Sequence, residues 1–399
     1  MEKYALYREL LNLPELEITD VVLSDHKIVI ACCVKSDVTE RTCPKCGKPT
    51  SCVNQEHVRE VRDLSISGRE VWLEIRTRQF VCRPCNRYFY EPLSFVDAHR
   101  NYTHRQSKYV FLLAQKQSAV EVGCLVNMVA KTVERLVLGE AKKVANLQKR
   151  YAQVRRLGID EQSHRKGKGD YFCVLTDIDR GIVIDMLPDR KMATLIAYFK
   201  ELGADFCQQI TDVCCDNWDA YISAATECFP NAKIILDRFH VTKQLNEGLD
   251  DLRKTLRKAD KENLNYRGLK WILFKQYHTL SDKQLDSLNA AIADHPRLGM
   301  LYHQREAFHH ILDNAQTVEI AMEKLIHWKI DTIKKGITEF DAFIKMLNTK
   351  QEFVVNYVTN YLSNAVTEGL NNLIRSIRRV SFGMTNFQNL RWRVLAISE

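Results

Sequence analysis

Hydrophobic residues in the middle of the chain fall into two repeating patterns. Several short, nearly continuous apolar runs have the length and composition of buried strands. Between the later runs, apolar residues recur at helical spacing, which predicts amphipathic helices over 193–202 and 218–228. The predicted strands cover residues 155–161, 171–176, 182–187, 210–215 and 233–236. This order predicts a mixed sheet with helices packed against it.

Three strands followed by helix, strand, helix and strand is the order of a ribonuclease-H-like α/β domain. In that architecture Asp160, on the first strand, and Asp216, just past the fourth, are neighbours in space. A carboxylate inside a sheet is tolerated only with a partner cation or a proton. We therefore interpret these two residues as ligands of a metal ion.

A third carboxylate, Glu368, lies far downstream in a segment with helical periodicity. Apolar positions predict its packing face, and they are Leu362, Val366, Leu370, Leu373 and Ile377. A polar stripe is expected on the opposite side, made of Tyr361, Asn364, Glu368, Asn371, Asn372, Arg375 and Arg379. Glu368 is thus predicted to face a polar site.

Three carboxylates from two strands and one helix suit hard divalent cations. Mg²⁺ prefers such oxygens and keeps positions for water and phosphate, and paired ions about 4 Å apart stabilise attacking and leaving oxygens. Asp160, Asp216 and Glu368 therefore predict a magnesium site for phosphodiester chemistry. The alternative is that each acid is only a strand end or a solvated helix position.

Two further polar residues follow the fifth predicted strand, Asp237 and His240. Asp237 is either an auxiliary acid or a helix N-cap, and His240 is placed to contact phosphate or assist proton transfer. The following residues, 241–350, are almost wholly helical and basic, with Trp271 and Trp328. That block is either a solvated surface or a track for a DNA backbone; we favour the track.

Two Cys-x-x-Cys turns lie near the amino terminus, Cys43 with Cys46 and Cys82 with Cys85. Each turn can present two thiolates to one tetrahedral zinc ion, and residues 61–80 between them alternate like a hairpin. A structural zinc site is predicted, against the alternatives of free thiols or a redox pair. Cys52 and His57 are competing ligands with a less suitable spacing.

Three helices are predicted next, at 105–116, 118–123 and 129–138. The tight turn before the last one indicates a helix-turn-helix that binds DNA. Its exposed side carries Lys131, Thr132, Glu134 and Arg135, and basic neighbours follow at Lys142, Lys143 and Lys149. The alternative is an ordinary helical subdomain.

Composition narrows the class of protein. The 399 residues include 45% hydrophobic residues, which excludes wholesale disorder. A net charge of +8 is compatible with a polyanionic partner. No signal peptide or membrane-spanning run is present, so we expect a cytoplasmic protein. Several of the 13 cysteines lie in apolar strands and are interpreted as core residues in a reducing compartment.

The fold class predicted from these patterns is multidomain α+β. We expect a zinc-binding β domain at 1–100, a helix-turn-helix domain at 101–150, and a ribonuclease-H-like catalytic core at 151–240 and 356–399, interrupted by a helical insertion at 241–355.

Four motifs carry a resemblance to a known family: 158–161 with Arg165-Lys166-Gly167, 215–221, 237–240, and 363–372. They resemble the DDE transposases of bacterial insertion sequences, in particular the zinc-finger-bearing ISL-three (ISL3) family. The resemblance covers nearly the whole chain, including the closing segment 379–387. Ala365 departs from the glycine usual before the acidic helix turn.

The resemblance implies that Asp160, Asp216 and Glu368 form a catalytic triad with Mg²⁺ or Mn²⁺. It also implies that the zinc and helix-turn-helix regions bind terminal inverted repeats of double-stranded DNA, with nucleoid association when bound. Cleavage and strand transfer at two DNA ends lead us to expect a homodimer. The alternatives are a nuclease without joining activity and a non-catalytic DNA-binding regulator. The predicted DNA contacts are Lys131, Thr132, Arg135, Arg375 and Arg379.

Overall fold

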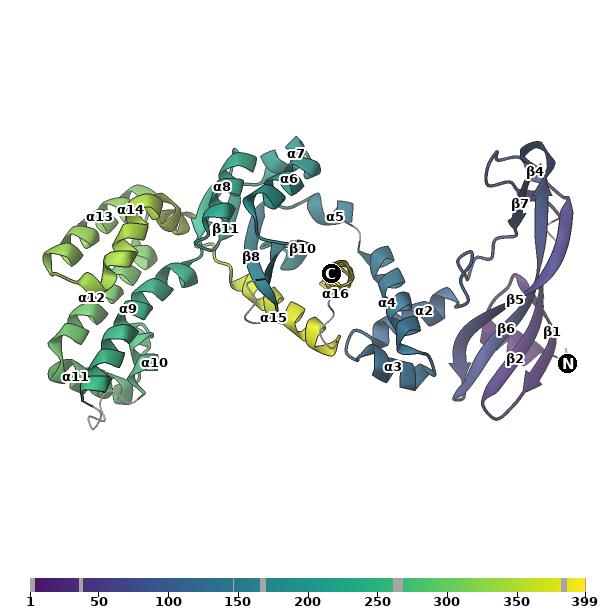
Figure 1. Cartoon of the computed structure of the whole chain (residues 1–399), viewed down its shortest axis with the longest axis horizontal. Helices are drawn as coiled ribbons and strands as arrows, with labels where there is room; N and C mark the ends of the chain where they lie inside the picture. The colour runs from purple at the N-terminus through teal and green to yellow at the C-terminus, as the bar shows by residue number, and fades with distance from the viewer. Residues whose placement is uncertain are drawn as a thin grey trace. The chain divides into compact units, whose positions relative to one another are not determined.

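The computed structural model describes residues 4–35, 39–145, 147–165, 170–260, 268–381 and 386–398. Lys166 and Gly167 of the first motif and residues 382–385 of the closing segment lie outside these ranges. The chain divides into two compact units (Figure 1): Met1–Ala145 with Ile377–Ile397, and Asn146–Ser376 with Ser398–Glu399. Each unit is described by itself.

A five-stranded sheet begins the first unit. Its strands are β1 (Leu16–Leu23), β2 (Lys27–Val34), β5 (Val53–Ile66), β6 (Arg69–Cys82) and β7 (Arg87–Tyr90), preceded by α1 (Ala5–Leu11). The order is β1-β2-β6-β5, with β7 also paired to β6. Antiparallel pairing of β5 and β6 confirms the predicted hairpin, and Gly68 at φ +77° lies in its turn. Alternate residues Val71, Leu73 and Ile75 point into the core.

Four helices complete the first unit: α2 (His104–Leu113), α3 (Ala119–Val126), α4 (Ala130–Val144) and α16 (Phe387–Ile397). Ser118 and Glu121 form a capping box that starts α3. Asn127, left-handed at φ 50°, ends α3 and turns the chain towards α4. Ala396 belongs to the buried cluster of these helices, and Arg393 donates to the carbonyl of Ala114. Helix α16 therefore packs with the helical module, whereas the predicted domain boundaries placed it in the catalytic core.

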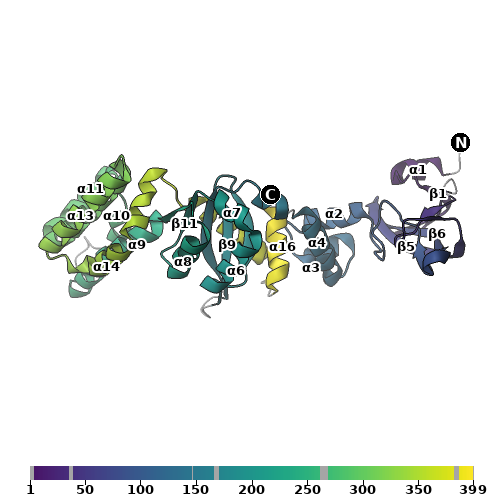
Figure 2. The same ribbon diagram turned by 90° about the horizontal axis from the view of Figure 1, so that it is seen from above.

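The second unit contains another five-stranded sheet. Its strands are β8 (Arg156–Arg165), β9 (Asp170–Asp177), β10 (Ile182–Leu187), β11 (Asp212–Cys215) and β12 (Lys233–Leu236). They run in the order β10-β9-β8-β11-β12. The pairs β8–β9 and β9–β10 are antiparallel, and β11 is parallel to both β8 and β12. All five predicted strands are confirmed. Helices beside the sheet are α5 (Leu147–Tyr151), α6 (Met192–Leu202), α7 (Ala204–Gln209) and α8 (Asp219–Cys228), several of them visible in Figure 2.

A helical block follows β12, as predicted. It comprises α9 (Arg238–Ala259), α10 (Leu269–Leu273), α11 (Asp282–Asp294), α12 (Pro296–Asn314), α13 (Val318–Lys334) and α14 (Asp341–Val355). Its buried residues belong to the same hydrophobic cluster as the sheet. Trp328 is 4% exposed and donates its indole N–H to the carbonyl of Gln304, so it belongs to the core and not to the proposed DNA track. Trp271 is 67% exposed.

The last helix of interest, α15 (Ala365–Val380), carries Glu368. Gly158 and Asp160 alternate with buried Leu157 and Ile159 along β8, so they share one face of the sheet. The N-terminal part of α15 lies against that face, because Thr367 of α15 would be only 2.5 Å from a Cβ atom at Gly158. Within the described residues, no helix is long and apolar enough to cross a membrane.

Candidate active site and zinc centre

Four cysteines, two from each Cys-x-x-Cys turn, lie close together in the first unit. Cys43 and Cys46 occupy the turn between β3 (Arg41–Thr42) and β4 (Pro49–Thr50). Cys82 ends β6, and Cys85 ends the 3₁₀ turn that follows it, η1 (Arg83–Cys85). Their four sulfurs all lie within 4.8 Å of one another, and Cys46 Sγ is 3.7 Å from Cys82 Sγ. A tetrahedral zinc ion with Zn–S bonds of about 2.3 Å places sulfurs about 3.8 Å apart. The cluster therefore fits zinc.

The electrostatics of these thiols favour a bound cation. Burial opposes ionisation of Cys43, but backbone N–H groups of Cys46 and Lys45 outweigh it and lower the pKa of the thiol to about 6. The neighbouring sulfur of Cys46, together with burial, raises the pKa of Cys85 to about 12. Without a cation, four adjacent thiolates would repel one another, so the arrangement requires a cation for full ionisation.

The two competing ligands lie outside this cluster. Cys52 is not part of the group of four sulfurs. His57 instead lies against Tyr90, with ring centroids 4.4 Å apart, and its Nδ1 is 3.0 Å from Thr77 Oγ1.

A cleft of about 710 Å³ in the second unit contains all three predicted acids. Ile159 of β8 pairs with Cys215 of β11 in parallel register, so the residues that follow, Asp160 and Asp216, emerge at the same edge. Glu368 reaches this edge from the first turn of α15. Among the described residues, however, the three carboxylates do not form a group whose oxygens all lie within 4.8 Å.

Asp160 is held on both carboxylate oxygens. Its Oδ1 accepts from the backbone N–H of Glu161 at 2.6 Å, and its Oδ2 accepts from Asn371 Nδ2 at 2.5 Å. Burial and the negative charge of Asp216 raise its pKa to about 7. The two neighbouring carboxylates therefore favour a bound cation.

Asp216, Asp237 and His240 form the tightest cluster in the cleft, with ligand atoms all within 4.8 Å. His240 Nδ1 lies 3.1 Å from Asp237 Oδ2, its hydrogen-bond partner, and 2.8 Å from Asp216 Oδ1. Burial opposes protonation of His240, but the two carboxylates outweigh it and raise the pKa to about 10. Asp216 Oδ1 is buried and accepts no hydrogen bond of acceptable geometry. This buried oxygen is paired by charge with His240, and the three side chains together could hold a metal ion.

Asp237 occupies the N-cap position of α9 without a side-chain capping bond. Its Oδ1 accepts instead from the backbone N–H of Asn364 at 3.0 Å. The carboxylate therefore joins the start of α9 to the segment that leads into α15.

The buried face of α15 differs from the prediction. Asn364 and Asn371 are 4% and 2% exposed and lie against the sheet, not in an exposed polar stripe. Asn364 donates to the carbonyl of Ile159 at 3.2 Å, and Gln162 Nε2 donates to Asn371 Oδ1 at 2.6 Å. Hydrophobic periodicity identifies only the apolar part of a packing face, and it does not reveal polar residues that are buried there by hydrogen bonds.

Gly158 permits this close approach. A Cβ at Gly158 would lie 2.3 Å from Thr176 Oγ1, 2.5 Å from Thr367 Oγ1 and 3.2 Å from Asn364 Oδ1. The two threonine hydroxyls are buried and 2.7 Å apart. The polar spacing 364, 367 and 371 was the available sign of this interface, since it places three polar residues on one side of a helix.

One rim of the cleft contains an arginine between two aromatic rings. Arg190 lies 4.1 Å from the ring centroid of Tyr171 and 4.3 Å from that of Trp218. It donates to Glu161 Oε1 at 2.6 Å, and Tyr221 donates to Glu161 Oε2 at 2.7 Å. The sequence analysis did not identify this group, because its members come from four separate elements.

The predicted DNA contacts lie in different places. Lys131 and Arg135 are exposed on α4, whereas Thr132 is partly buried. Arg375 is exposed, lines the cleft and donates to Asn372 Oδ1 at 2.7 Å. Arg379 is exposed in the part of α15 that belongs to the first unit.

Comparisons with known proteins agree with the residue pattern. Residues 157–394 match the ISL3 family of DDE transposases, described as "Transposase", and residues 39–85 match a family described as the zinc-finger of transposase IS204/IS1001/IS1096/IS1165. The transposase for insertion sequence element IS1557 of Mycobacterium tuberculosis is 26% identical over 426 residues, covering 98% of this chain and 94% of that protein. The transposase for insertion sequence element IS1001 of Bordetella parapertussis is 25% identical over 347 residues, covering 86% of this chain and 84% of that protein.

Proposed function

Because this chain belongs to the ISL3 family of insertion-sequence transposases, we propose that it cleaves DNA at the ends of its element and joins those ends to target DNA through a DDE triad. The observation that carries the proposal is the meeting of Asp160, Asp216 and Glu368 in one cleft, from positions far apart in the chain. The order β10-β9-β8-β11-β12 supports the predicted ribonuclease-H-like core.

The three acids are the proposed ligands for catalytic Mg²⁺ or Mn²⁺. When bound, the ions would act as Lewis acids at the reacting phosphate and lower the pKa of the attacking hydroxyl. The raised pKa of Asp160 supports this assignment, because burial and the neighbouring charge of Asp216 disfavour its ionised form unless a cation binds. Asp237 and His240 are auxiliary residues in this proposal.

The chain's own groups hold the acids in place. Asn371 fixes Asp160 Oδ2, and His240 lies against Asp216 Oδ1. Arg375, at the cleft, offers a cation to the DNA backbone. Water would attack the phosphorus at the element end, and the released 3′ hydroxyl would then attack target DNA. Both reactions are in-line displacements at phosphorus, so one cleft serves both.

DNA recognition is assigned to the first unit. The turn from Asn127 to Val129 between α3 and α4 supports a helix-turn-helix, and Lys131 and Arg135 are exposed near the start of the second helix. The zinc module, with α2 to α4, would bind the terminal inverted repeats as double-stranded DNA. Pairing of two ends makes a homodimer the expected assembly.

A strand-transfer assay with labelled element ends tests the proposal and separates its alternatives. Joined products are expected with Mg²⁺ or Mn²⁺. Cut but unjoined ends would indicate a nuclease, and binding without cleavage would indicate a regulator. Either of these results would refute transposition by this chain.

A further inference from the structure

Two basic surfaces occur in the first unit, at the zinc end and on α4. At the zinc end, segments 41–50 and 82–90 contain no acidic residue. Their exposed cations are Lys45, Lys48, Arg83 and Arg87. On α4, Lys131 and Arg135 are exposed. Both surfaces suit a DNA backbone, because phosphate contacts are made mainly by such residues.

The segment that connects these surfaces, 91–103, is fixed at its start. Glu91 is 3% exposed, and its carboxylate accepts from the backbone N–H of Arg78 and from Arg78 Nη2, both at 2.8 Å. Arg41, next to the zinc turn, lies 3.3 Å from the same carboxylate. Burial opposes ionisation of Glu91, but these arginines keep its pKa below the usual range.

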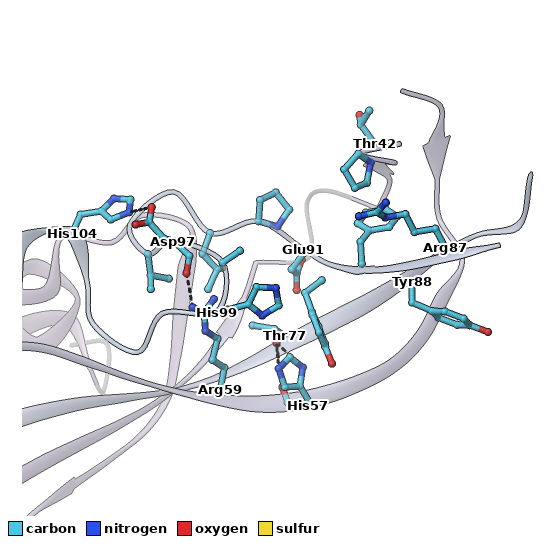
Figure 3. Close-up of a pocket in the computed structure, with 17 residues that line it drawn as sticks. Thr42, His57, Arg59, Thr77, Arg87, Tyr88, Glu91, Asp97, His99 and His104 are labelled. Atoms are coloured by element: carbon cyan, nitrogen blue, oxygen red, sulfur yellow. Dashed lines mark hydrogen bonds and ion pairs between the residues drawn. The ribbon is translucent and has the colours of Figure 1, made fainter. Parts of the chain in front are cut away.

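The middle of the segment is fixed as well. Arg59 of β5 donates to the carbonyl of Asp97 at 2.7 Å. The Asp97 carboxylate pairs with His104 Nε2 of α2 at 2.9 Å and with Lys143 Nζ of α4 at 3.0 Å. Figure 3 shows Arg59, Asp97 and His104 at one end of a pocket of about 730 Å³ between the segment and the sheet.

The end of the segment contacts Arg62, a buried residue of β5. Arg62 is 4% exposed and bonds through its backbone to residues 101 and 103. Its guanidinium donates to the carbonyls of Asn127, at 2.8 Å, and Val126. These carbonyls belong to the end of α3 and the turn into α4. Glu70 completes this joint, since it lies 3.4 Å from Arg62 Nη2 and accepts from Asn127 Nδ2.

The carboxylate of Asp63, the next residue of β5, binds the start of α2. Asp63 is 1% exposed and accepts from Thr103 Oγ1 and Arg105 Nε, both at 2.7 Å. Thr103 is the N-cap of α2. Removing one partner from such buried pairs leaves an uncompensated charge, which is strongly destabilising. The zinc-bearing sheet and the helices are thus joined by buried ionic contacts and not by a flexible tether.

We propose that the zinc module and α4 read one DNA duplex at a fixed spacing, and that Arg62 and Glu70 are the positioning residues that set it. This inference rests on the proposed function, because it takes the ligand to be the element's end DNA. A rigid protein with two DNA-binding surfaces gains affinity from both only when the distance between the two sites on DNA matches the distance between the surfaces.

The experiment uses the full zinc-loaded chain and end DNA whose two protected segments have been mapped by footprinting. Inserting five base pairs between the segments should weaken wild-type binding by about tenfold or more. Glu70→Gln and Arg62→Ala should weaken binding to the native end and lose most of this spacing dependence. Glu74→Gln, the same change on the same strand, should behave as wild type. Zinc content and circular dichroism verify that each variant is folded. If Arg62→Ala does not fold, the spacing dependence of Glu70→Gln alone decides the test.

Three results would overturn the inference. Wild-type binding that tolerates the insertion would refute the fixed spacing between the zinc module and α4, while leaving the proposed transposition untouched. Unchanged spacing dependence in Glu70→Gln would refute the role of the joint. Failure of the wild-type chain to bind any end DNA would refute the proposed function and this inference together.

Discussion

Replacing Gly158 with Ala tests how the active site is assembled. The new methyl group would meet Thr176 Oγ1 at 2.3 Å and Thr367 Oγ1 at 2.5 Å. Both atoms are buried in a hydrogen bond to each other, so neither can move away freely. Overpacking of this kind costs about 1–3 kcal/mol. We expect α15 to shift away from β8 and to carry Glu368 with it.

The expected catalytic loss is larger than the loss of stability. A displacement of about 1 Å at a reacting centre can reduce the rate about 100-fold. The assay compares metal-dependent cleavage of end DNA with the free energy of unfolding in denaturant. Gly369→Ala is the matched control, because it lies beside Glu368 on α15 and a Cβ there meets nothing within 4 Å. It should keep activity and gain up to about 1 kcal/mol. A Gly158→Ala enzyme as stable and active as wild type would refute the proposed approach of α15 to β8.

Three further predictions concern the metal sites. Asp160→Asn, Asp216→Asn or Glu368→Gln should abolish cleavage while end-DNA affinity, measured by gel shift, stays nearly unchanged; parallel loss of binding would contradict these roles. Cys85→Ser should release zinc and unfold the zinc module, and unchanged zinc content by atomic absorption would contradict the cluster. His240, with its pKa raised from 6.5 to about 10, stabilises the fold fully below pH 6.5 and loses that contribution as pH rises towards 10. Unfolding free energy in magnesium-free buffer should fall over that range more steeply for wild type than for His240→Gln, and equal slopes would refute the contribution.

Local patterns predicted the strands and the cysteine turns well. The strands of the second sheet are short apolar runs whose burial requires no information beyond their own composition. The cysteines are similarly local, because each Cys-x-x-Cys turn presents two sulfurs without help from the rest of the chain. These features follow from residues adjacent in sequence.

The packing of α15 was predicted less well, since it depends on partners distant in sequence. Asn364 and Asn371 are polar, yet they are buried because carbonyl and amide groups near Asp160 satisfy them. The position of α16 was missed for the same reason. Its packing with the helical module joins residues more than 200 positions apart, as the hydrogen bond from Arg393 to Ala114 at the end of α2 illustrates, and helical periodicity does not specify a partner.

The central claim is that three distant acids hold catalytic metal together, and a crystal soaked in Mn²⁺ tests it most directly. The anomalous signal should place manganese within bonding distance of Asp160, Asp216 and Glu368 after small side-chain movements. Manganese bound only by Asp216, Asp237 and His240, the tightest cluster in the structure, with Asp160 and Glu368 remote from it, would contradict the account.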